Sequence, residues 1–318
     1  MSSTVDFGVF LSAEPPSFDD FLSEVKECEA LGYHSVWLSD HLIGMYQHPG
    51  SERFECWTTL STLAGTTSRI RLGSLVLCNT FRHPSLLAKM AASLDVISRG
   101  RLDFGIGAGW HEPEFEAYGY PFEKPVTRIR RLSEAVQIVK RMWTEPHPNF
   151  EGHFYKIKDA YCSPKPVQKP HPPVMIGGGG EQLMLRVVAQ YADVCNFSGW
   201  LGRPEDYRHK LDLLECHCES LGRDPREIRK SWAAYVIVKE DAREAEDIVK
   251  HFVKRLASHY GRPENELMVP IAGTPEECVE QIQRYIDVGI SLFILMFYGG
   301  DSIGEAKLFA DEVVPAFR

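Results

Sequence analysis

The sequence predicts a (β/α)8 barrel, also called a TIM barrel, and two observations carry that prediction. Short apolar segments alternate with amphipathic helical segments eight times over the 318 residues, which is the order that an eight-stranded barrel requires. Glycine-rich or polar residues directly follow several of the apolar segments, where a barrel places its binding residues. A doubly wound sheet is the alternative. The Gly105–Gly109 run matches a dinucleotide fingerprint only partly, because Trp110 and His111 follow where a helix should begin.

The predicted strands are short and aliphatic, as strands buried in a parallel sheet are. We expect them at residues 5–11, 34–38, 70–77, 101–106, 173–176, 192–197, 232–238 and 292–297. Apolar residues at three- and four-residue spacing predict the helices. We expect helices at 17–32, 56–64, 86–94, 132–143, 181–190, 207–221, 242–257, from 274 onward, and at 303–313. Ser17 with Asp20, and Thr274 with Pro275 and Glu277, are typical helix starts.

The chain is predicted to form a single domain over residues 1–318, with one insertion. Residues 144–172 hold six prolines, one glycine and several aromatic residues, which interrupt the alternation just before the fifth strand. We expect this segment to form a hairpin with an irregular return.

Composition and charge narrow the class of function. Hydrophobic residues make up 44% and charged residues 25% of the chain, as in an ordinary globular protein. The formal net charge of −9 argues against a broad nucleic-acid surface. No apolar run approaches the roughly 20 residues that cross a bilayer, and the first ten residues lack the features of a signal peptide. We therefore expect a protein that binds neither nucleic acid nor membrane and takes a small-molecule substrate.

The cysteines indicate neither a disulfide framework nor a metal site. The eight cysteines include no CxxC motif, which predicts reduced thiols in a cytoplasmic protein. Cys216-His217-Cys218 has the wrong spacing for a zinc knuckle and lies in a segment with the pattern of an amphipathic helix. No GxSxG motif and no GxxxxGK[ST] phosphate loop occur, so neither a serine hydrolase nor a nucleoside triphosphatase is indicated.

In a barrel the active site forms at the carboxyl ends of the strands, so residues that follow a strand are the candidates. Asp40 and His41 follow the second strand, and a carboxylate beside an imidazole can orient and tune a proton donor or base. A turn-capping role for Asp40 is the alternative. Asn79 follows the third strand and offers both a donor and acceptors. Arg82 and His83 come next and could meet anionic groups, but the residues alone favour a turn with a surface arginine before Pro84.

Two glycine runs complete the candidate site. The spacing of Gly105–Gly109 lets the backbone approach a flat ligand, with Trp110 as a wall and His111 and Glu114 as polar contacts. A glycine-rich turn beside a buried tryptophan is the alternative. Gly177–Gly180 precedes a predicted helix, and backbone N–H groups at a helix start form a phosphate site. The residues alone therefore predict a flat ligand that carries a phosphate.

These segments together resemble the bacterial luciferase-like monooxygenase superfamily, and most closely its coenzyme F420-dependent oxidoreductases. The resembling segments cover nearly the whole chain, at residues 30–41, 71–84, 105–114, 164–166, 176–180 and 273–277. The resemblance implies a luciferase-like (β/α)8 barrel with its insertion near strand five. It also implies a deazaflavin or flavin that lies across the strand ends.

The resemblance implies roles for individual residues. A non-proline cis peptide behind the deazaflavin ring is expected at Leu75-Val76. Asp40 and His41 match an Asp-His pair at the ring edge. His41 is the expected proton donor or acceptor, and Asp40 is expected to orient His41 or the ring. The predicted cofactor-binding residues are Asp40, Leu75, Val76, Asn79, Ala108, Gly109, Gly177, Gly178, Gly179 and Gly180.

The substrate pocket departs from the sugar-phosphate dehydrogenases of that group. Trp110 stands where those enzymes have a glutamate, and Met45 stands where they have a tryptophan. We therefore expect an apolar pocket, formed by Met45, Trp110 and His111, that does not suit a sugar phosphate.

The predicted function is hydride transfer between C5 of coenzyme F420 and an organic carbonyl, alcohol or activated alkene, by a cytoplasmic homodimer. One alternative is an FMN-dependent monooxygenase that uses O2 and a partner flavin reductase. The other is a non-catalytic flavin-binding protein.

Overall fold

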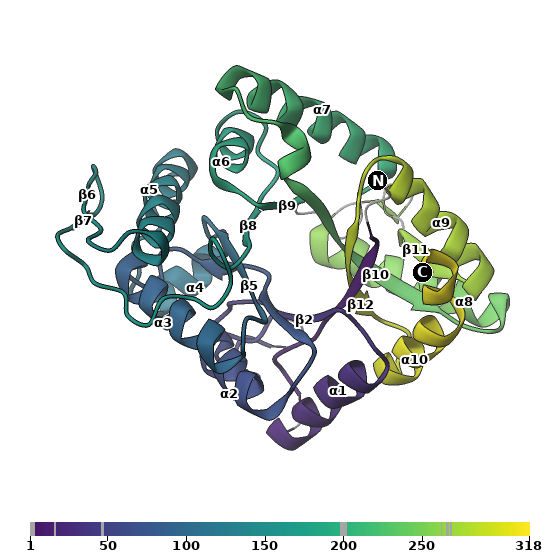
Figure 1. Ribbon diagram of the computed structural model, residues 1–318. Helices are drawn as coiled ribbons and strands as arrows, with labels where there is room; N and C mark the ends of the chain where they lie inside the picture. The colour runs from purple at the N-terminus through teal and green to yellow at the C-terminus, as the bar shows by residue number, and fades with distance from the viewer. Residues whose placement is uncertain are drawn as a thin grey trace.

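Eight parallel strands close into a barrel, which confirms the predicted fold class (Figure 1). In pairing order they are β12 (Leu292–Phe297), β1 (Asp6–Phe10), β2 (Ser35–Leu38), β3 (Arg71–Ser74), β5 (Leu102–Gly107), β8 (Val174–Gly177), β9 (Val194–Phe197) and β10 (Arg229–Val238). The ring closes because β10 pairs with both β9 and β12. The computed structural model describes residues 4–15, 17–45, 48–197, 202–261, 263–264, 267 and 269–318.

Helices surround the strands (Figure 1). They are α1 (Phe18–Ala30), α2 (Cys56–Thr66), α3 (Pro84–Ile97), α4 (Glu112–Ala117), α5 (Pro125–Thr144), α6 (Leu183–Tyr191), α7 (Pro204–Leu221), α8 (Ala242–Tyr260), α9 (Pro275–Asp287) and α10 (Ser302–Glu312). The predicted caps form as expected, since Ser17 accepts from Asp20 N–H and Thr274 shares a capping box with Glu277. Within the described residues, no helix has the length and apolarity needed to cross a membrane.

Three local elements differ from the sequence prediction. The expected third strand at 70–77 is two pieces, β3 and β4 (Leu77–Cys78), because a cis peptide between Leu75 and Val76 interrupts it. The short helix α4 and the strand β11 (Ile271–Gly273), which pairs parallel with the end of β10, were not predicted. Both are too short to show a hydrophobic period in the sequence.

The predicted insertion contains the expected hairpin. Strands β6 (Phe150–Glu151) and β7 (Lys156–Ile157) pair antiparallel, and they project beyond α5 at the edge of the molecule (Figure 1). The insertion therefore leaves the barrel ring itself uninterrupted.

Alternate residues of each strand divide between two apolar layers. On β10, Trp232, Ala234 and Val236 pack in the layer between strands and helices. Ala233, Tyr235 and Ile237 belong to a second cluster, which fills the barrel with side chains from β1, β2, β8, β9 and β12. This period of two is the ordinary consequence of strand geometry.

The close packing of β5 against the cis segment leaves no room for a side chain at Gly105. A Cβ there would lie 1.9 Å from Ser74 O, a backbone atom that cannot turn away. We expect Gly105→Ala to lower the free energy of unfolding by about 1–3 kcal/mol, measured by urea denaturation. Gly65→Ala is the matched control, because nothing lies within 4 Å of its Cβ and alanine favours a helix. Equal stability of the two variants would contradict the packing argument.

Candidate active site

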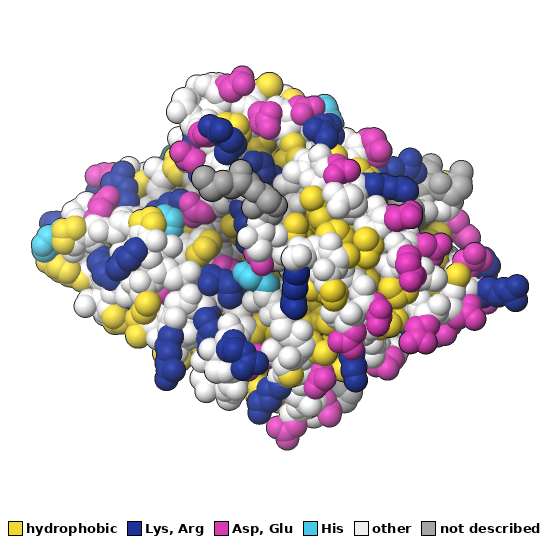
Figure 2. All heavy atoms as spheres, turned by 45° about the vertical axis from the view of Figure 1, so that its right-hand side comes forward, with side chains coloured by type: hydrophobic (Ala, Val, Ile, Leu, Met, Phe, Trp, Pro, Cys, Tyr) yellow, Lys and Arg dark blue, Asp and Glu magenta, His cyan; other side chains and the backbone are white. Residues whose placement is uncertain are grey.

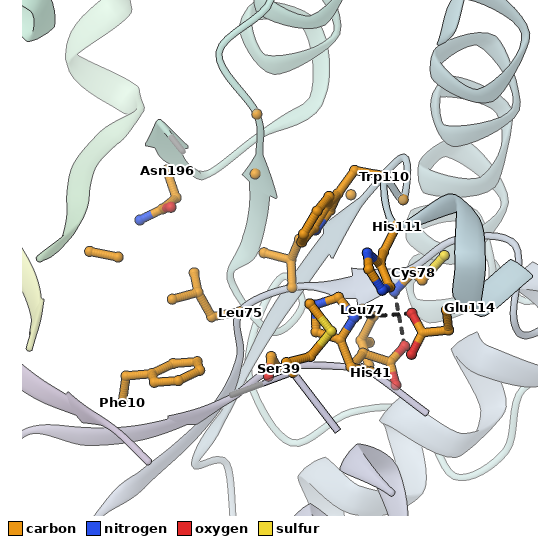
Figure 3. A pocket seen from close by; sticks show the side chains of 18 of the residues that line it. Phe10, Ser39, His41, Leu75, Leu77, Cys78, Trp110, His111, Glu114 and Asn196 are labelled. Atoms are coloured by element: carbon orange, nitrogen blue, oxygen red, sulfur yellow. Dashed lines mark hydrogen bonds and ion pairs between the residues drawn. The ribbon is translucent and has the colours of Figure 1, made fainter. Parts of the chain in front are cut away.

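A cavity of about 750 Å³ opens at the carboxyl ends of the strands. Its volume is in the upper part of the range for small-molecule sites, which is about 300–1,000 Å³. Segments after β2, β3, β5, β8 and β12 line it, together with residues of β1, β9, β10, α4 and α8. Figure 3 shows Phe10, His41 and Trp110 among the lining side chains. The cavity therefore lies where the barrel architecture predicts an active site.

The structure brings most of the predicted site residues to this cavity. Those on its wall are Asp40, His41, Met45, Leu75, Val76, Ala108, Gly109, Trp110, His111, Gly177 and Gly178. Asn79, Gly179 and Gly180 are not part of the described lining. Asn79 is buried and donates to Tyr155 Oη at 3.4 Å, while its Oδ1 has no hydrogen-bond partner among the described residues. Contacts of these three residues with a cofactor remain a prediction.

The cis peptide between Leu75 and Val76 confirms the expectation for this bond. It places both side chains on the cavity wall, and glycines accommodate Val76. A Cβ on Gly107 would lie 2.7 Å from Val76 Cγ2, and one on Gly177 would lie 3.0 Å from Val76 Cγ1. Glycine is needed at both positions because the bulge approaches the neighbouring strand ends closely.

Asp40 is held by Arg82, which is not the surface arginine that the sequence favoured, because its side chain is only 11% exposed. Arg82 donates from Nη1 to Asp40 Oδ2 at 2.7 Å and from Nη2 to Oδ1 at 2.9 Å. Arg82 also contacts Glu55, and Asp40 Oδ2 accepts from Cys78 N–H at 2.9 Å. Burial opposes the charge of Arg82, but these two carboxylates outweigh it and raise the pKa of its guanidinium. The charge of Arg82 is therefore already compensated within the protein.

His41 is oriented by Glu114 and not by Asp40, which corrects one part of the prediction. His41 Nδ1 lies 3.0 Å from Glu114 Oε2, and the Glu114 side chain is only 2% exposed. Glu114 also accepts from the backbone N–H groups of Leu42 and Ile43. Burial opposes ionisation, but the hydrogen bonds from His41 and Leu42 outweigh it and lower the pKa of Glu114. The ionised carboxylate keeps a proton on Nδ1, which leaves Nε2 of His41 for chemistry.

A second arginine fixes the loop that carries His41 and Met45. Arg53 Nη1 donates to Glu14 Oε1 at 2.6 Å, and its Nε donates to His41 O at 3.0 Å. Glu14 Oε1 also accepts from Met45 N–H at 2.7 Å, and both charged side chains are at most 3% exposed. Neither Arg53 nor Glu14 was singled out from the sequence. Arg53 lies far from a strand end and in no recognisable motif. Glu14 follows the predicted first strand by three residues, as His41 follows the second, so its position was a signal that could have found it.

Two rings lie against His41 at the cavity wall. Trp110 and His111 stand at right angles to it, with ring centroids 5.7 and 6.0 Å away (Figure 3). Trp110 is 65% exposed, so the interpretation of a buried tryptophan is wrong and the pocket-wall interpretation is supported. Met45 lines the same cavity.

The glycine run after β8 adopts a conformation suited to glycine. Gly178 has a φ of 139°, and a Cβ there would lie 3.0 Å from Met184 Cγ. Lys210 Nζ donates to Gly179 O at 2.7 Å, which places a cation against the loop that precedes α6. A backbone loop, a helix start and a lysine together suit an anionic group.

The opposite wall of the cavity is aromatic. Phe252 lies between Tyr235 and Tyr298, with ring centroids 4.8 and 4.1 Å away. Arg255 donates to Tyr298 Oη at the rim. Figure 2 shows hydrophobic side chains gathered in the middle of one face of the molecule, with acidic and basic side chains interspersed around them.

A second cavity, of about 410 Å³, lies at the other end of the barrel, against residues at the amino ends of the strands. Its two arginines are paired, Arg71 with Asp103 at 2.6 Å and Arg229 with Asp6 at 2.6 Å. These ion pairs close the amino end of the barrel, and the larger cavity is the candidate site. Within the described part of the chain, no group of His, Cys, Asp or Glu could hold a metal ion.

A buried carboxyl behind the site makes stability depend on pH. Burial raises the pKa of Glu305 from 4.5 to about 7, although Gly299 N–H and the Lys239 ammonium oppose the shift. The folded protein therefore binds this proton more tightly than the unfolded chain does. Its stabilising effect is full below pH 4.5 and is lost as pH rises to about 7.

We expect Glu305→Gln to remove this loss. The unfolding free energy of the variant should gain up to about 3 kcal/mol on that of the wild type between pH 4.5 and 7.5. Urea denaturation at several pH values measures the difference. Glu312→Gln on the same helix is the control, because Glu312 is exposed. A pH-independent difference for Glu305→Gln would refute the assignment.

The sequence is similar to known proteins along most of its length. Residues 2–292 match the family described as luciferase-like monooxygenase. The chain is 27% identical to the F420-dependent glucose-6-phosphate dehydrogenase of Microbacterium testaceum, over 100% of this chain and 99% of that protein. It is 28% identical to the F420-dependent hydroxymycolic acid dehydrogenase of Mycobacterium tuberculosis, over 74% of this chain and 63% of that protein.

Solved structures share the fold. The coenzyme F420-dependent tetrahydromethanopterin reductase of Methanopyrus kandleri superposes with a TM-score of 0.82 at 21% identity. The superposition covers 99% of this chain and 100% of that one.

Proposed function

The chain belongs to the luciferase-like monooxygenase family, and we propose that within it this protein is a coenzyme F420-dependent oxidoreductase. The proposal rests on one observation above the others. A relative that matches along the whole chain, and a second that matches along 74% of it, are both F420-dependent dehydrogenases. The substrate we propose is a small organic alcohol, its carbonyl counterpart, or an activated alkene.

The cavity fits a flat tricyclic cofactor with a phosphate. Glycines at 107 and 177 accommodate the Leu75-Val76 bulge, on whose face the ring would rest. The backbone of Asp40, Ala108 and Gly109 would meet the ring, and the run of glycines that ends at 180 would hold the phosphate near Lys210. When bound, F420 supplies the hydride chemistry at its C5 atom.

The protein's own side chains would bind the substrate and move its proton. His41, held by Glu114 through Nδ1, would exchange a proton or donate a hydrogen bond at the substrate oxygen through Nε2. Arg53 and Glu14 keep the His41 loop in place. The aromatic wall of Tyr235, Phe252 and Tyr298 would exclude water and favour an apolar substrate.

A sugar phosphate suits this cavity poorly. The described lining contains one cationic side chain, Arg255, at the rim, whereas a phosphate is usually met by several donors and charges. Met45 and Trp110 add apolar surface near His41. The proposed substrate is therefore less polar than that of the glucose-6-phosphate dehydrogenase relative.

An FMN-dependent monooxygenase with a partner reductase is the second candidate. The family description names monooxygenases, and the glycine run suits the phosphate of either cofactor. The proposal further includes a cytoplasmic homodimer. The eight cysteines, which are all free thiols, support a reducing compartment.

Titration of the purified apoprotein with F420 and, separately, with FMN tests the proposal by fluorescence. Tight F420 binding with weak FMN binding is the expected result. Preference for FMN would favour the monooxygenase and direct the search to a reductase. Binding of neither would overturn the interpretation of the cavity as a cofactor site. Sedimentation of the same sample measures the oligomeric state.

A further inference from the structure

Two histidines from different segments face each other in the active-site cavity. His41 comes from the loop after β2, and His111 comes directly after the glycine run that follows β5. Their ring centroids are 6.0 Å apart and the rings are perpendicular (Figure 3). Both line the cavity, so both reach the space where a substrate would bind.

The two imidazoles have different surroundings. His41 is anchored through Nδ1 to Glu114 at 3.0 Å. His111 is the N-cap residue of α4, where a side chain usually accepts from the first turn, yet its ring makes no such bond. Within the part of the chain that the structure describes, His111 is held only by ring contacts, with His41 and with Trp110 at 5.0 Å. Its nitrogens are therefore available to a ligand.

The charges around His111 favour its neutral form. Burial, followed by the charge of the neighbouring His41, lowers the pKa of His111, and Glu114 opposes these effects. Asp40, the other carboxylate of this wall, is engaged by Arg82. Two titratable groups whose surroundings differ in this way commonly divide the acid and base roles of a site.

We propose that His111 is the second proton carrier of the active site, which accepts the hydroxyl proton of an alcohol substrate while Nε2–H of a protonated His41 donates a hydrogen bond to the same oxygen. This inference rests on the proposed function. In the oxidising direction the O–H proton passes to a neutral His111 nitrogen. The deazaflavin, when bound, would supply the acceptor for the carbinol hydrogen and its electron pair, so that the C=O bond could form. In the reducing direction the His111 imidazolium returns the proton to the carbonyl oxygen.

The charge states can be measured without any substrate. Long-range ¹H–¹⁵N NMR of ¹⁵N-histidine-labelled protein, titrated from acid to alkaline pH, reports the protonation and tautomer of each ring. The His111→Gln spectrum assigns the His111 signals. We expect His111 to be neutral at pH 7, to titrate below the ordinary value of about 6.5, and to titrate higher in His41→Gln. A His111 ring that is charged at pH 7, or that ignores His41, would overturn the proposal.

Turnover supplies the second readout, with F420 and 1-phenylethanol as the probe pair. His111→Gln should lower kcat/KM about 100-fold and remove the acidic limb of its pH profile. Added imidazole should restore part of the activity of His111→Ala, which a merely structural loss would not allow. His147→Gln, in the exposed hairpin segment, is the matched control and should match the wild type.

The outcomes separate the two proposals. Failure of the wild type to bind F420 overturns the proposed function, while the NMR titration still decides the charge state of His111. Normal F420 binding and turnover with an unchanged pH profile in His111→Gln overturns the role of His111 alone. If the wild type turns over neither 1-phenylethanol nor acetophenone, the NMR titration alone tests the role of His111.

Discussion

Replacing His41 by asparagine should lower kcat/KM about 10²- to 10⁴-fold, the usual contribution of a positioned acid or base. Its Nε2 is the nitrogen left for the substrate once Glu114 holds Nδ1. Asparagine keeps a polar group near the loop. The Arg53 contact is also retained, because it is made to the backbone oxygen of residue 41. Steady-state kinetics with F420 and the same alcohol probe measure the loss, and fluorescence titration measures cofactor affinity, which should be unchanged.

Glu114→Gln is the companion variant, because it keeps the shape of the side chain and removes its charge. We expect a smaller loss of kcat than in His41→Asn, since the imidazole is still contacted but its preferred tautomer is no longer imposed. Unchanged turnover in His41→Asn would show that His41 neither exchanges a proton with the substrate oxygen nor hydrogen-bonds it. A loss of F420 affinity equal to the loss of kcat/KM would assign His41 to cofactor binding.

Replacing Arg82 by methionine should lower the free energy of unfolding by about 3–5 kcal/mol, as expected when a buried ion pair loses one partner. The Asp40 side chain is fully buried, and Arg82 supplies both of its ion-pair hydrogen bonds. Without the guanidinium, a carboxylate remains in the barrel mouth, and among the described residues Cys78 N–H is its remaining donor. Urea denaturation measures the change.

Arg226→Met is the matched control for Arg82→Met. Arg226 also makes hydrogen bonds through two nitrogens to an aspartate, Asp224, but this pair lies on the surface. Exposed pairs contribute little, so the control should leave the unfolding midpoint unchanged. The double variant Arg82→Met/Asp40→Asn should recover part of the lost stability, because it removes the uncompensated charge. Equal stability of the two single variants would show that the Asp40–Arg82 pair is not structural.

The hydrophobic periods in the sequence predict the barrel because they depend only on neighbouring residues. Each strand is a local apolar run and each helix a local 3.6-residue pattern, so the eight-fold alternation is visible before folding. Position directly after a strand likewise predicts Asp40, His41 and Trp110 as cavity residues, since a barrel gathers all its strand ends at one face. The cis peptide at Leu75-Val76 was expected from resemblance and is confirmed.

The partners of those residues are decided only by the closed barrel. Asp40 lies beside His41 in the sequence, which predicted that the two interact. In the structure Asp40 pairs with Arg82, and His41 pairs with Glu114, 73 positions away. Adjacent residues of an extended segment point to different sides, so sequence neighbours at a strand end meet different segments. Which carboxylate reaches which base depends on how closure of the barrel brings the loops after β2, β4 and β5 together. The distances between these loops cannot be predicted from a local sequence pattern.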